Sequence, residues 1–128
     1  MLYKALTSKI IEAFYKVNDS LGYGFLEKVY ENAMYIELIK RGFDVKRQKN
    51  IKVFYKGYIV GDYYADLIIN NRIIVELKAA KTLSEEHEAQ LLNYLRSTKI
   101  EVGLLLNFGK KAEFKRKIYT NKPRLKSI

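Results

Sequence analysis

Residues 65–78, with the sequence ADLIINNRIIVELK, decide the fold of this chain. Two apolar runs flank the pair Asn70-Asn71, and asparagine tolerates the positive φ angles of a tight reversal. The pattern predicts two strands, over residues 58–69 and 72–79, which meet at this turn. The second run is almost continuously apolar, which is typical of a central strand buried on both faces.

The residues at the start of the chain predict two helices. Apolar side chains recur at helical spacing over residues 2–17 and again over residues 25–41, where Gly42 marks the end. In the second helix we expect one stripe to be buried, made of Leu26, Val29, Ala33 and Ile36.

Strands and one more helix account for the rest of the chain. Residues 51–55 alternate like a strand and turn at Lys56-Gly57 into the strand over 58–69, with a bend expected at Gly61. Ser84 is a good N-cap for a helix over residues 84–96. Short apolar and alternating runs predict strands over residues 102–107 and 112–119, the last of them at an edge.

The order of these elements predicts an α/β fold, in which two helices are followed by βββαββ. Its first three strands form an antiparallel meander, and a right-handed crossover through the helix makes the next strand parallel. The result is a mixed five-stranded sheet flanked by helices. The chain has 128 residues, 48% of them hydrophobic, and we expect one domain over residues 1–128.

The composition excludes several classes of site. The chain contains no cysteine and one histidine, His87, which excludes disulfides, thiol nucleophiles and metal sites made of several histidines. Hard-metal chemistry on carboxylates stays open. No apolar run could span a membrane, and residues 1–11 lack the features of a secretory signal. We therefore expect a protein of the cytoplasm.

Positive charge is concentrated in two stretches. The net charge is +10, with +6 over Lys40–Lys56 and +7 over residues 110–128, so the remainder is acidic. Nucleic acid is the commonest partner of such a protein. The alternative is that lysine-rich faces keep a small domain soluble.

Charged residues interrupt the two central strands at Asp66, Glu76 and Lys78. Glu76 and Lys78 are two apart on a strand and point to the same face, where an unpaired charge is expensive. Two carboxylates and a lysine at one spot suit metal-assisted hydrolysis of a phosphodiester bond. The alternative is a buried ion pair between Glu76 and Lys78, with Asp66 an ordinary acid at a strand end.

If Asp66 and Glu76 belong to one site, the turn between their strands must have a suitable length. With a two-residue loop at Asn70-Asn71, Asp66 would lie opposite Val75 and face away from Glu76. A three-residue loop centred on Asn71, or a bulge, would bring Asp66 opposite Glu76.

These residues resemble the PD-(D/E)xK nuclease superfamily and, within it, the GxxExxY proteins. The motif that names this group stands here as Gly24–Tyr30, with Glu27 at its centre. Ala65 replaces the proline of the superfamily motif. The resemblance covers about residues 5–120, and its other elements are Gly61, Ala65-Asp66, Val75–Ala79, His87, Ala89-Gln90, Asn93–Leu95 and Gly103–Gly109.

The resemblance implies a restriction-endonuclease-like fold and a divalent metal, Mg²⁺ or Mn²⁺. Asp66, Glu76 and the backbone carbonyl of Leu77 would hold the metal, and Lys78 would be the catalytic lysine. Glu27 would join the metal shell directly or through water, and Tyr30 shares its helix face three residues on. The alternative for Glu27 is a surface acid that interacts with the helix dipole.

Gln90 and Tyr94 resemble the Q-x-x-x-Y element of RecB-like nucleases. Four residues apart on a helix, they reach the same side and could contact a phosphate or support the lysine. The alternative is that Tyr94 is packing and Gln90 its hydrogen-bonded neighbour. His87 is a helix-start residue, and at most a supporting or phosphate contact. The tyrosines at 55, 58, 63 and 64 favour sheet packing over base stacking.

We therefore expect a metal-dependent nuclease that acts on nucleic acid, with DNA favoured, without strong sequence specificity. A junction resolvase acting as a homodimer is a variant of this reading. The alternatives are a non-catalytic nucleic-acid-binding module and a subunit of a DNA repair or defence assembly. The cations expected to grip the nucleic acid backbone are Lys46, Arg47, Lys49, Lys52, Lys115, Arg116 and Lys117.

Overall fold

Two helices precede the sheet in the computed structural model, which describes residues 2–120 of the chain. Helix α1 spans Lys4–Leu21 and helix α2 spans Glu27–Lys40, so both predicted helices are confirmed. Helix α1 runs four residues beyond its predicted end at Val17 and stops at Gly22, whose φ of 73° a side chain would disfavour.

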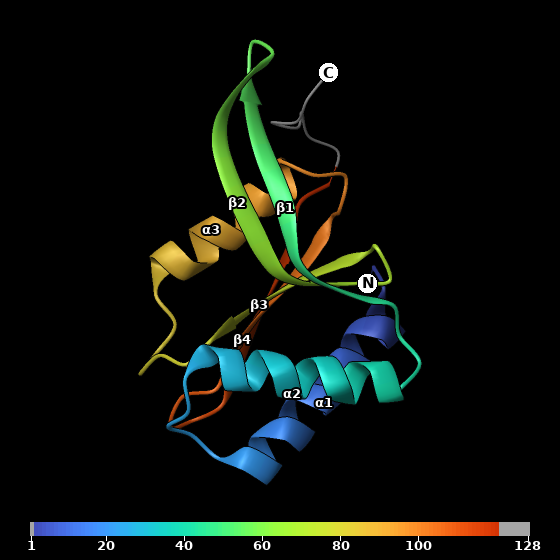
Figure 1. The fold of residues 1–128 in the computed structure, drawn as a ribbon, viewed down its shortest axis with the longest axis vertical. Helices are drawn as coiled ribbons and strands as arrows, with labels where there is room; N and C mark the ends of the chain where they lie inside the picture. Colours follow the sequence, from blue (N-terminus) through green and yellow to red (C-terminus); the bar gives the residue numbers. More distant parts are fainter. Residues whose placement is uncertain (1, 121–128) are drawn as a thin grey trace.

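The sheet has five strands in the order β1-β2-β3-β4-β5 (Figure 1). Strand β3 pairs with β4 in parallel and every other neighbouring pair is antiparallel, which confirms the predicted meander and crossover. Helix α3 forms the crossover between β3 and β4. The elements after α2 are β1 (Val45–Tyr55), β2 (Tyr58–Ile69), β3 (Ile73–Lys78), α3 (Glu85–Arg96), β4 (Val102–Asn107) and β5 (Glu113–Ile118).

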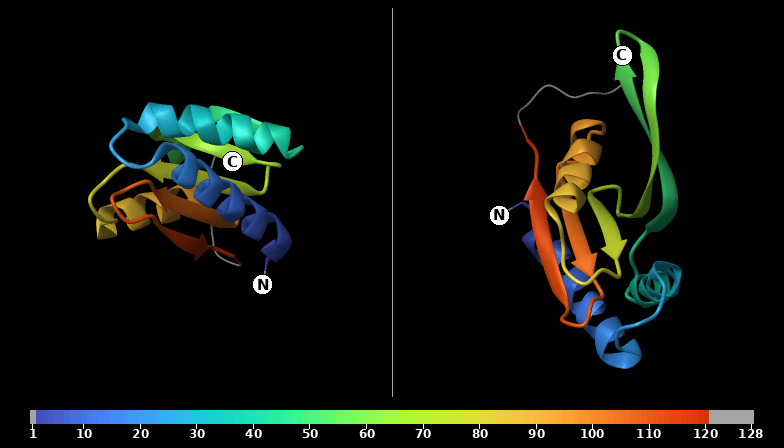
Figure 2. Two further views of the ribbon diagram at one scale, coloured as in Figure 1. Left: turned by 90° about the horizontal axis from the view of Figure 1, so that it is seen from below. Right: turned by 90° about the vertical axis from the view of Figure 1, so that its left-hand side faces the viewer.

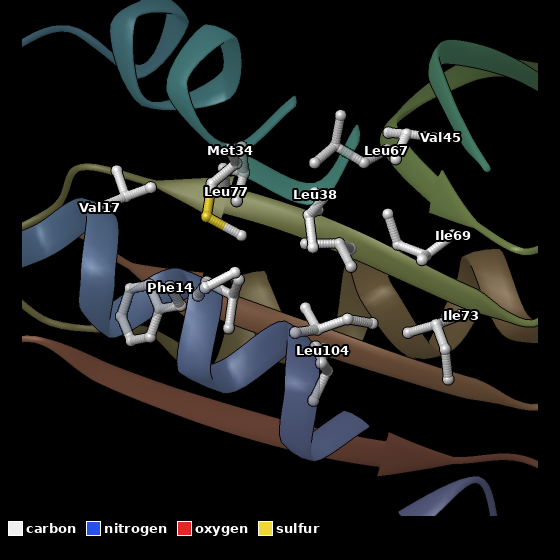
Figure 3. Packing of buried hydrophobic residues seen from close by; sticks show 14 of the residues in the cluster. Phe14, Val17, Met34, Leu38, Val45, Leu67, Ile69, Ile73, Leu77 and Leu104 are labelled. Atoms are coloured by element: carbon white, nitrogen blue, oxygen red, sulfur yellow. The ribbon is translucent and has the colours of Figure 1, made fainter. Parts of the chain in front are cut away.

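Helices α1 and α2 cover one face of the sheet and α3 covers the other (Figure 2). On the first face, Phe14, Met34 and Leu38 of the helices pack with Leu77 and Leu104 of the strands (Figure 3). The burial of these side chains from water is the main force that joins the layers. Within residues 2–120, no helix combines the length and the apolar character that crossing a bilayer requires.

The predicted buried stripe of α2 is wrong. Leu26, which lies just before the helix, is 81% exposed, and Ile36 is 55% exposed. The core face is instead formed by Tyr30, Met34 and Leu38, which recur at intervals of four. Apolar residues lie all round this helix, so the periodicity alone could not select the face that packs on the sheet.

Strand β1 begins at Val45, six residues before the predicted start at Ile51. Its first half is polar and contains Gln48, whose φ of 47° breaks the regular pleat. Position 48 has no partner in the β1–β2 ladder, where Arg47 pairs with Leu67 and Lys49 pairs with Ala65. This irregularity removed the alternation on which a prediction from sequence depends.

The turn between β2 and β3 has the three-residue form that the site requires. Ile69 pairs with Ile73, so Asn70, Asn71 and Arg72 form the loop. Asn70 and Asn71 both have positive φ angles, of 52° and 54°. The resulting register pairs Leu67 with Val75 and places Asp66 next to Glu76.

The hairpin of β1 and β2 extends beyond the other strands as an arm (Figures 1 and 2). Lys56 and Gly57 form its predicted two-residue turn, with φ angles of 50° and 84°. Near the tip the register shifts, because Val53 pairs with Gly61 and Phe54 pairs with Ile59. Val60 is the extra residue of this bulge, beside the bend expected at Gly61.

Candidate active site

Strands β2 and β3 stop pairing beyond Leu67 and Val75, and two carboxylates replace the next hydrogen bonds of the ladder. The backbone N–H of Asp66 donates to Glu76 Oε2 at 2.7 Å. The backbone N–H of Leu77 donates to Asp66 Oδ2 at 2.8 Å. Both carboxylates therefore lie in the gap between the diverging strands, each satisfying a backbone donor that the divergence leaves free.

Lys78 lies two residues beyond Glu76 on β3, so both side chains leave the same face of the strand. The positive charge of Lys78 acts on both Asp66 and Glu76. Yet Lys78 forms no ion pair shorter than 4.0 Å with any described residue. The expected alternative, a direct ion pair between Glu76 and Lys78, is not formed in this structure.

The two carboxylates are unusually hard to ionise. Glu76 is only 5% exposed, and burial together with the charge of Asp66 raises its pKa to about 8. Burial also raises the pKa of Asp66, partly offset by the hydrogen bond from Leu77. Negative charge is thus concentrated here, and no cationic side chain of residues 2–120 forms an ion pair with it, an arrangement typical of a functional site.

Glu27 is the first residue of α2 and borders the same site. It lines a cleft of about 270 Å³ together with Asp66 and Leu77, and its charge contributes to the raised pKa of Glu76. Over residues 2–120, no three His, Asp or Glu side chains are arranged to hold a metal ion among themselves. The structure thus brings Asp66 and Glu76 into contact and places Glu27 beside them.

Gln48 joins this cleft to a second, buried carboxylate. Its Nε2 donates to Glu31 Oε1 at 2.7 Å and makes a longer contact of 3.4 Å to Asp66 Oδ1. Arg47 donates to Glu31 Oε2 from Nε at 3.1 Å and from Nη2 at 2.9 Å, and Lys28 donates to it at 3.2 Å. Burial raises the pKa of Glu31, but these hydrogen bonds outweigh burial and the net pKa is lowered.

Sequence reasoning missed Glu31 and Gln48. The signal for Glu31 was its place between Tyr30 and Met34 on the buried side of α2, and the choice of the wrong stripe concealed it. Gln48 gave no usable signal, because its role depends on a positive φ angle inside a strand.

Tyr30 lies in the core and does not face the cleft. Its ring is fully buried and stacks on Phe108, with ring centroids 4.3 Å apart. Its hydroxyl donates to the carbonyl oxygen of Gly22 at 2.6 Å and accepts from the N–H of Phe25 at 3.3 Å. The expected shared face with Glu27, which is exposed, is therefore wrong, and Tyr30 instead fixes the loop that leads into α2.

The predicted elements of α3 have structural contacts of their own. Gln90 Nε2 donates to the hydroxyl of Tyr94 at 2.8 Å, and Tyr94 is almost fully buried. The carboxylates also act on Tyr94, because burial and the charges of Glu76 and Asp66 raise its pKa to about 12. His87 completes a capping box, in which its Nδ1 accepts from the N–H of Ser84 at 3.1 Å.

The seven predicted nucleic-acid-binding cations differ in how free they are. Lys49, Lys52 and Lys115 are exposed and make no ion pair within the described residues, although Lys52 Nζ donates to Asn50 Oδ1. The other four also have intramolecular partners. These are Asn71 for Lys46, Glu31 and Asn32 for Arg47, the Leu2 carbonyl oxygen for Arg116, and Glu88 for Lys117.

Comparisons with known proteins agree with the fold. Two chains of solved structures match, and one of them is described as "Crystal structure of SSO0001". It aligns with a TM-score of 0.57 at 19% sequence identity, over 76% of this chain and 50% of the solved one. The present chain thus spans half the length of that protein, and the likeness concerns the fold alone. No curated protein matches the sequence.

The family comparison covers nearly the whole of the described chain. Residues 4–117 match the family model of the PD-(D/E)XK nuclease superfamily. The α/β fold with its mixed five-stranded sheet is consistent with the restriction-endonuclease-like architecture expected from the sequence. The chain belongs to the PD-(D/E)XK nuclease superfamily.

Proposed function

We propose that this chain hydrolyses phosphodiester bonds of nucleic acid, with DNA as its substrate, in a reaction that requires Mg²⁺ or Mn²⁺. The observation that carries the proposal is the contact between Asp66 and Glu76 in the gap between β2 and β3. Lys78 follows on the same strand face and pairs with no anion of residues 2–120. Two carboxylates and a free ammonium group are the groups that this chemistry needs.

The donor set fits a hard divalent cation. Asp66, Glu76 and the backbone carbonyl of Leu77 offer only oxygen ligands, which Mg²⁺ and Mn²⁺ prefer. Glu76 Oε1 has no hydrogen-bond partner within residues 2–120. The raised pKa values of both carboxylates reflect negative charge that a cation would neutralise. Glu27, beside the same cleft, would contribute through a water molecule.

A bound cation would polarise the phosphate and lower the pKa of a water molecule held at the site. In the proposed mechanism, Lys78 orients that water and stabilises the negative charge that develops on the phosphate. Gln48 would hold Asp66 in place from the side of β1. Membership of the GxxExxY group, suggested by residues 24–30, belongs to the same proposal.

We expect the chain to hold its substrate through the phosphates of the nucleic acid backbone and not by recognising individual bases. The exposed lysines at 49, 52 and 115 are positioned to contact phosphates without sequence preference. We therefore propose cleavage without strong sequence specificity.

The test is cleavage of labelled single-stranded, duplex, flapped and four-way-junction DNA in Mg²⁺, Mn²⁺ or EDTA. We expect metal-dependent cutting by the native protein and a loss of about 10²-fold or more in Asp66→Asn. Asp62→Asn is the matched control, because Asp62 is an exposed acid on the same strand and should cut normally. Salt-sensitive binding without cutting in any metal would overturn the proposal in favour of a binding module.

A further inference from the structure

A groove of about 550 Å³ separates the arm of β1 and β2 from helix α3. Volumes of about 300–1,000 Å³ are typical of small-molecule sites. The arm contributes Val53, Gly61 and Tyr63, and α3 contributes Gln90, Asn93 and Tyr94.

Tyr94 borders the groove and lies near the carboxylates. Its ring lines the groove, and the charges of Glu76 and Asp66 act on its hydroxyl. The ring of Tyr63 follows, with its centroid 5.8 Å from that of Tyr94. A strand whose phosphate lies at Asp66 and Glu76 could therefore place a neighbouring nucleotide in the groove.

The groove offers an aromatic face in a fixed position. Tyr63 is 45% exposed, so part of its ring is available to a ligand. Its ring lies close to Gly61, where an added Cβ would approach the ring to 2.8 Å and Val53 to 3.2 Å. A glycine at this position thus allows the ring to lie against the strand backbone.

The polar groups of the groove suit a base and do not suit a phosphate. Among residues 2–120, no lysine or arginine lines the groove, and Glu86, which does line it, would repel an anion. The side-chain amide of Asn93 has no hydrogen-bond partner within residues 2–120 and can both donate and accept. A neutral, flat ligand with donors and acceptors along one edge matches these walls.

We propose that the groove binds an unpaired base of the strand that is cut, stacked on Tyr63 and hydrogen-bonded by Asn93. Bases of an intact duplex are stacked on one another and cannot enter a pocket of this kind. The inference rests on the proposed function and narrows its substrate to single strands, flaps or frayed ends. It also assigns a role to Tyr63, which the sequence pattern favoured as sheet packing.

The test measures binding in EDTA, so that it does not depend on cleavage. The probes are a single-stranded oligonucleotide that contains 2-aminopurine and a blunt duplex of the same sequence. We expect Tyr63→Leu to weaken single-strand binding about tenfold and to abolish the quenching of 2-aminopurine, since base stacking is lost. Tyr63→Phe keeps the ring and should behave like the native protein.

Tyr64→Leu is the matched control, because Tyr64 is the next residue on β2 and does not line the groove. It should leave single-strand binding and quenching unchanged, and no variant should alter duplex binding. Asn93→Ala removes an exposed amide on α3, so it tests the groove even if Tyr63→Leu does not fold. It should weaken single-strand binding severalfold.

Three results would overturn the inference: equal losses in Tyr63→Leu and Tyr64→Leu, equal losses on single strand and duplex, or a changed oligomeric state without an effect on quenching. The last result would show that a second copy of the chain covers the groove. Failure of the proposed function is a separate outcome, because it would appear as quenching and binding without cleavage in metal.

Discussion

Glu76 occupies a position where folding and function make opposite demands. Its carboxylate is buried between two strands and lies beside Asp66, so the charged form is disfavoured in the folded protein. A carboxylate chosen for stability alone would be replaced by a neutral group of similar shape. The cost of ionising Glu76 is explained if a bound cation neutralises the site during function.

This conflict predicts a stability that depends on pH in the absence of metal. The pKa of Glu76 is about 8 in the folded chain, against 4.5 for an ordinary glutamate. The folded state therefore binds more protons between these values, and its stability should fall as pH rises from about 4.5 to about 8. Glu76→Gln should be more stable than the native protein at pH 8 by about 4 kcal/mol and nearly equal to it at pH 4.

Urea unfolding of both proteins in EDTA across this pH range checks the prediction. Addition of Mg²⁺ or Mn²⁺ at pH 8 should stabilise the native protein and leave Glu76→Gln almost unchanged. A native protein that is as stable as the variant at every pH would show that Glu76 is not under strain.

Tyr30 predicts a different kind of effect, on positioning. Tyr30→Phe keeps the stacking on Phe108 but removes the hydroxyl that joins Gly22 to Phe25. We expect a loss of about 1–2 kcal/mol in the free energy of unfolding, as for a buried hydrogen-bonding group. Cleavage should weaken less than in Asp66→Asn, because Tyr30 acts only through the start of α2.

Thermal unfolding and cleavage rates test this, with Tyr58→Phe as the control. Tyr58 is 76% exposed at the tip of the arm, so loss of its hydroxyl should change neither quantity. If Tyr30→Phe proved as stable as the native protein, the hydrogen bonds of Tyr30 would not hold this loop.

At the scale of elements, the loop between β2 and β3 decides whether the site exists. Its three residues set the register that places Asp66 beside Glu76, and two of them have positive φ angles. Asn71→Ala should destabilise the fold by about 1–2 kcal/mol, since alanine is strained at this φ angle. Asn71→Gly relieves the strain and should lose less, although both lose the contact from Lys46. Equal stabilities in urea unfolding would contradict this account of the turn.

The sequence did not decide the length of this loop. It placed the reversal at Asn70-Asn71 and left a two-residue loop, a three-residue loop and a bulge open, and these alternatives put Asp66 on opposite faces. The type and order of the elements were predictable, since long periodic segments and the Ser84 cap leave local signals. In this cap His87 accepts the second hydrogen bond, at the position where a capping box usually has glutamate or glutamine.

Other elements could not be predicted, for physical reasons. The buried face of α2 depends on which apolar residues meet the sheet, and Leu26 and Ile36 are as apolar as Met34 and Leu38. The role of Gln48 depends on a local irregularity of β1 that composition does not encode. The hydrogen bonds around Glu31 depend on the buried face of α2 and on the irregularity at Gln48, so they could not be predicted either.

At the scale of the whole molecule, charge should govern affinity for nucleic acid. The net charge of +10 supplies attraction, but only some cations are free to meet phosphates. We predict that replacing Lys49 and Lys52 by alanine makes the negative slope of log K against log salt less steep by about 0.9 for each lysine on duplex DNA. Replacing Lys16 on α1, which Figure 1 shows below the sheet and away from the arm, should not change the slope.

Titrations at several salt concentrations in EDTA measure these slopes. Arg47→Met provides a contrast, because Arg47 is held by Glu31 and its loss should lower stability more than it lowers the slope. An unchanged slope in the double lysine variant would mean that the nucleic acid lies elsewhere on the protein.

We propose that Asp66, Glu76 and Lys78 form the centre of a metal-dependent nuclease. The most direct measurement is single-turnover cleavage of single-stranded DNA in Mg²⁺ by the native protein, Lys78→Ala and Lys81→Ala. Lys81 is an exposed lysine three residues beyond Lys78, so its loss should leave the rate unchanged. We expect Lys78→Ala to bind DNA normally and to cut it about 10²-fold or more slowly. Cleavage by Lys78→Ala at the native rate would show that Lys78 is not part of the catalytic centre.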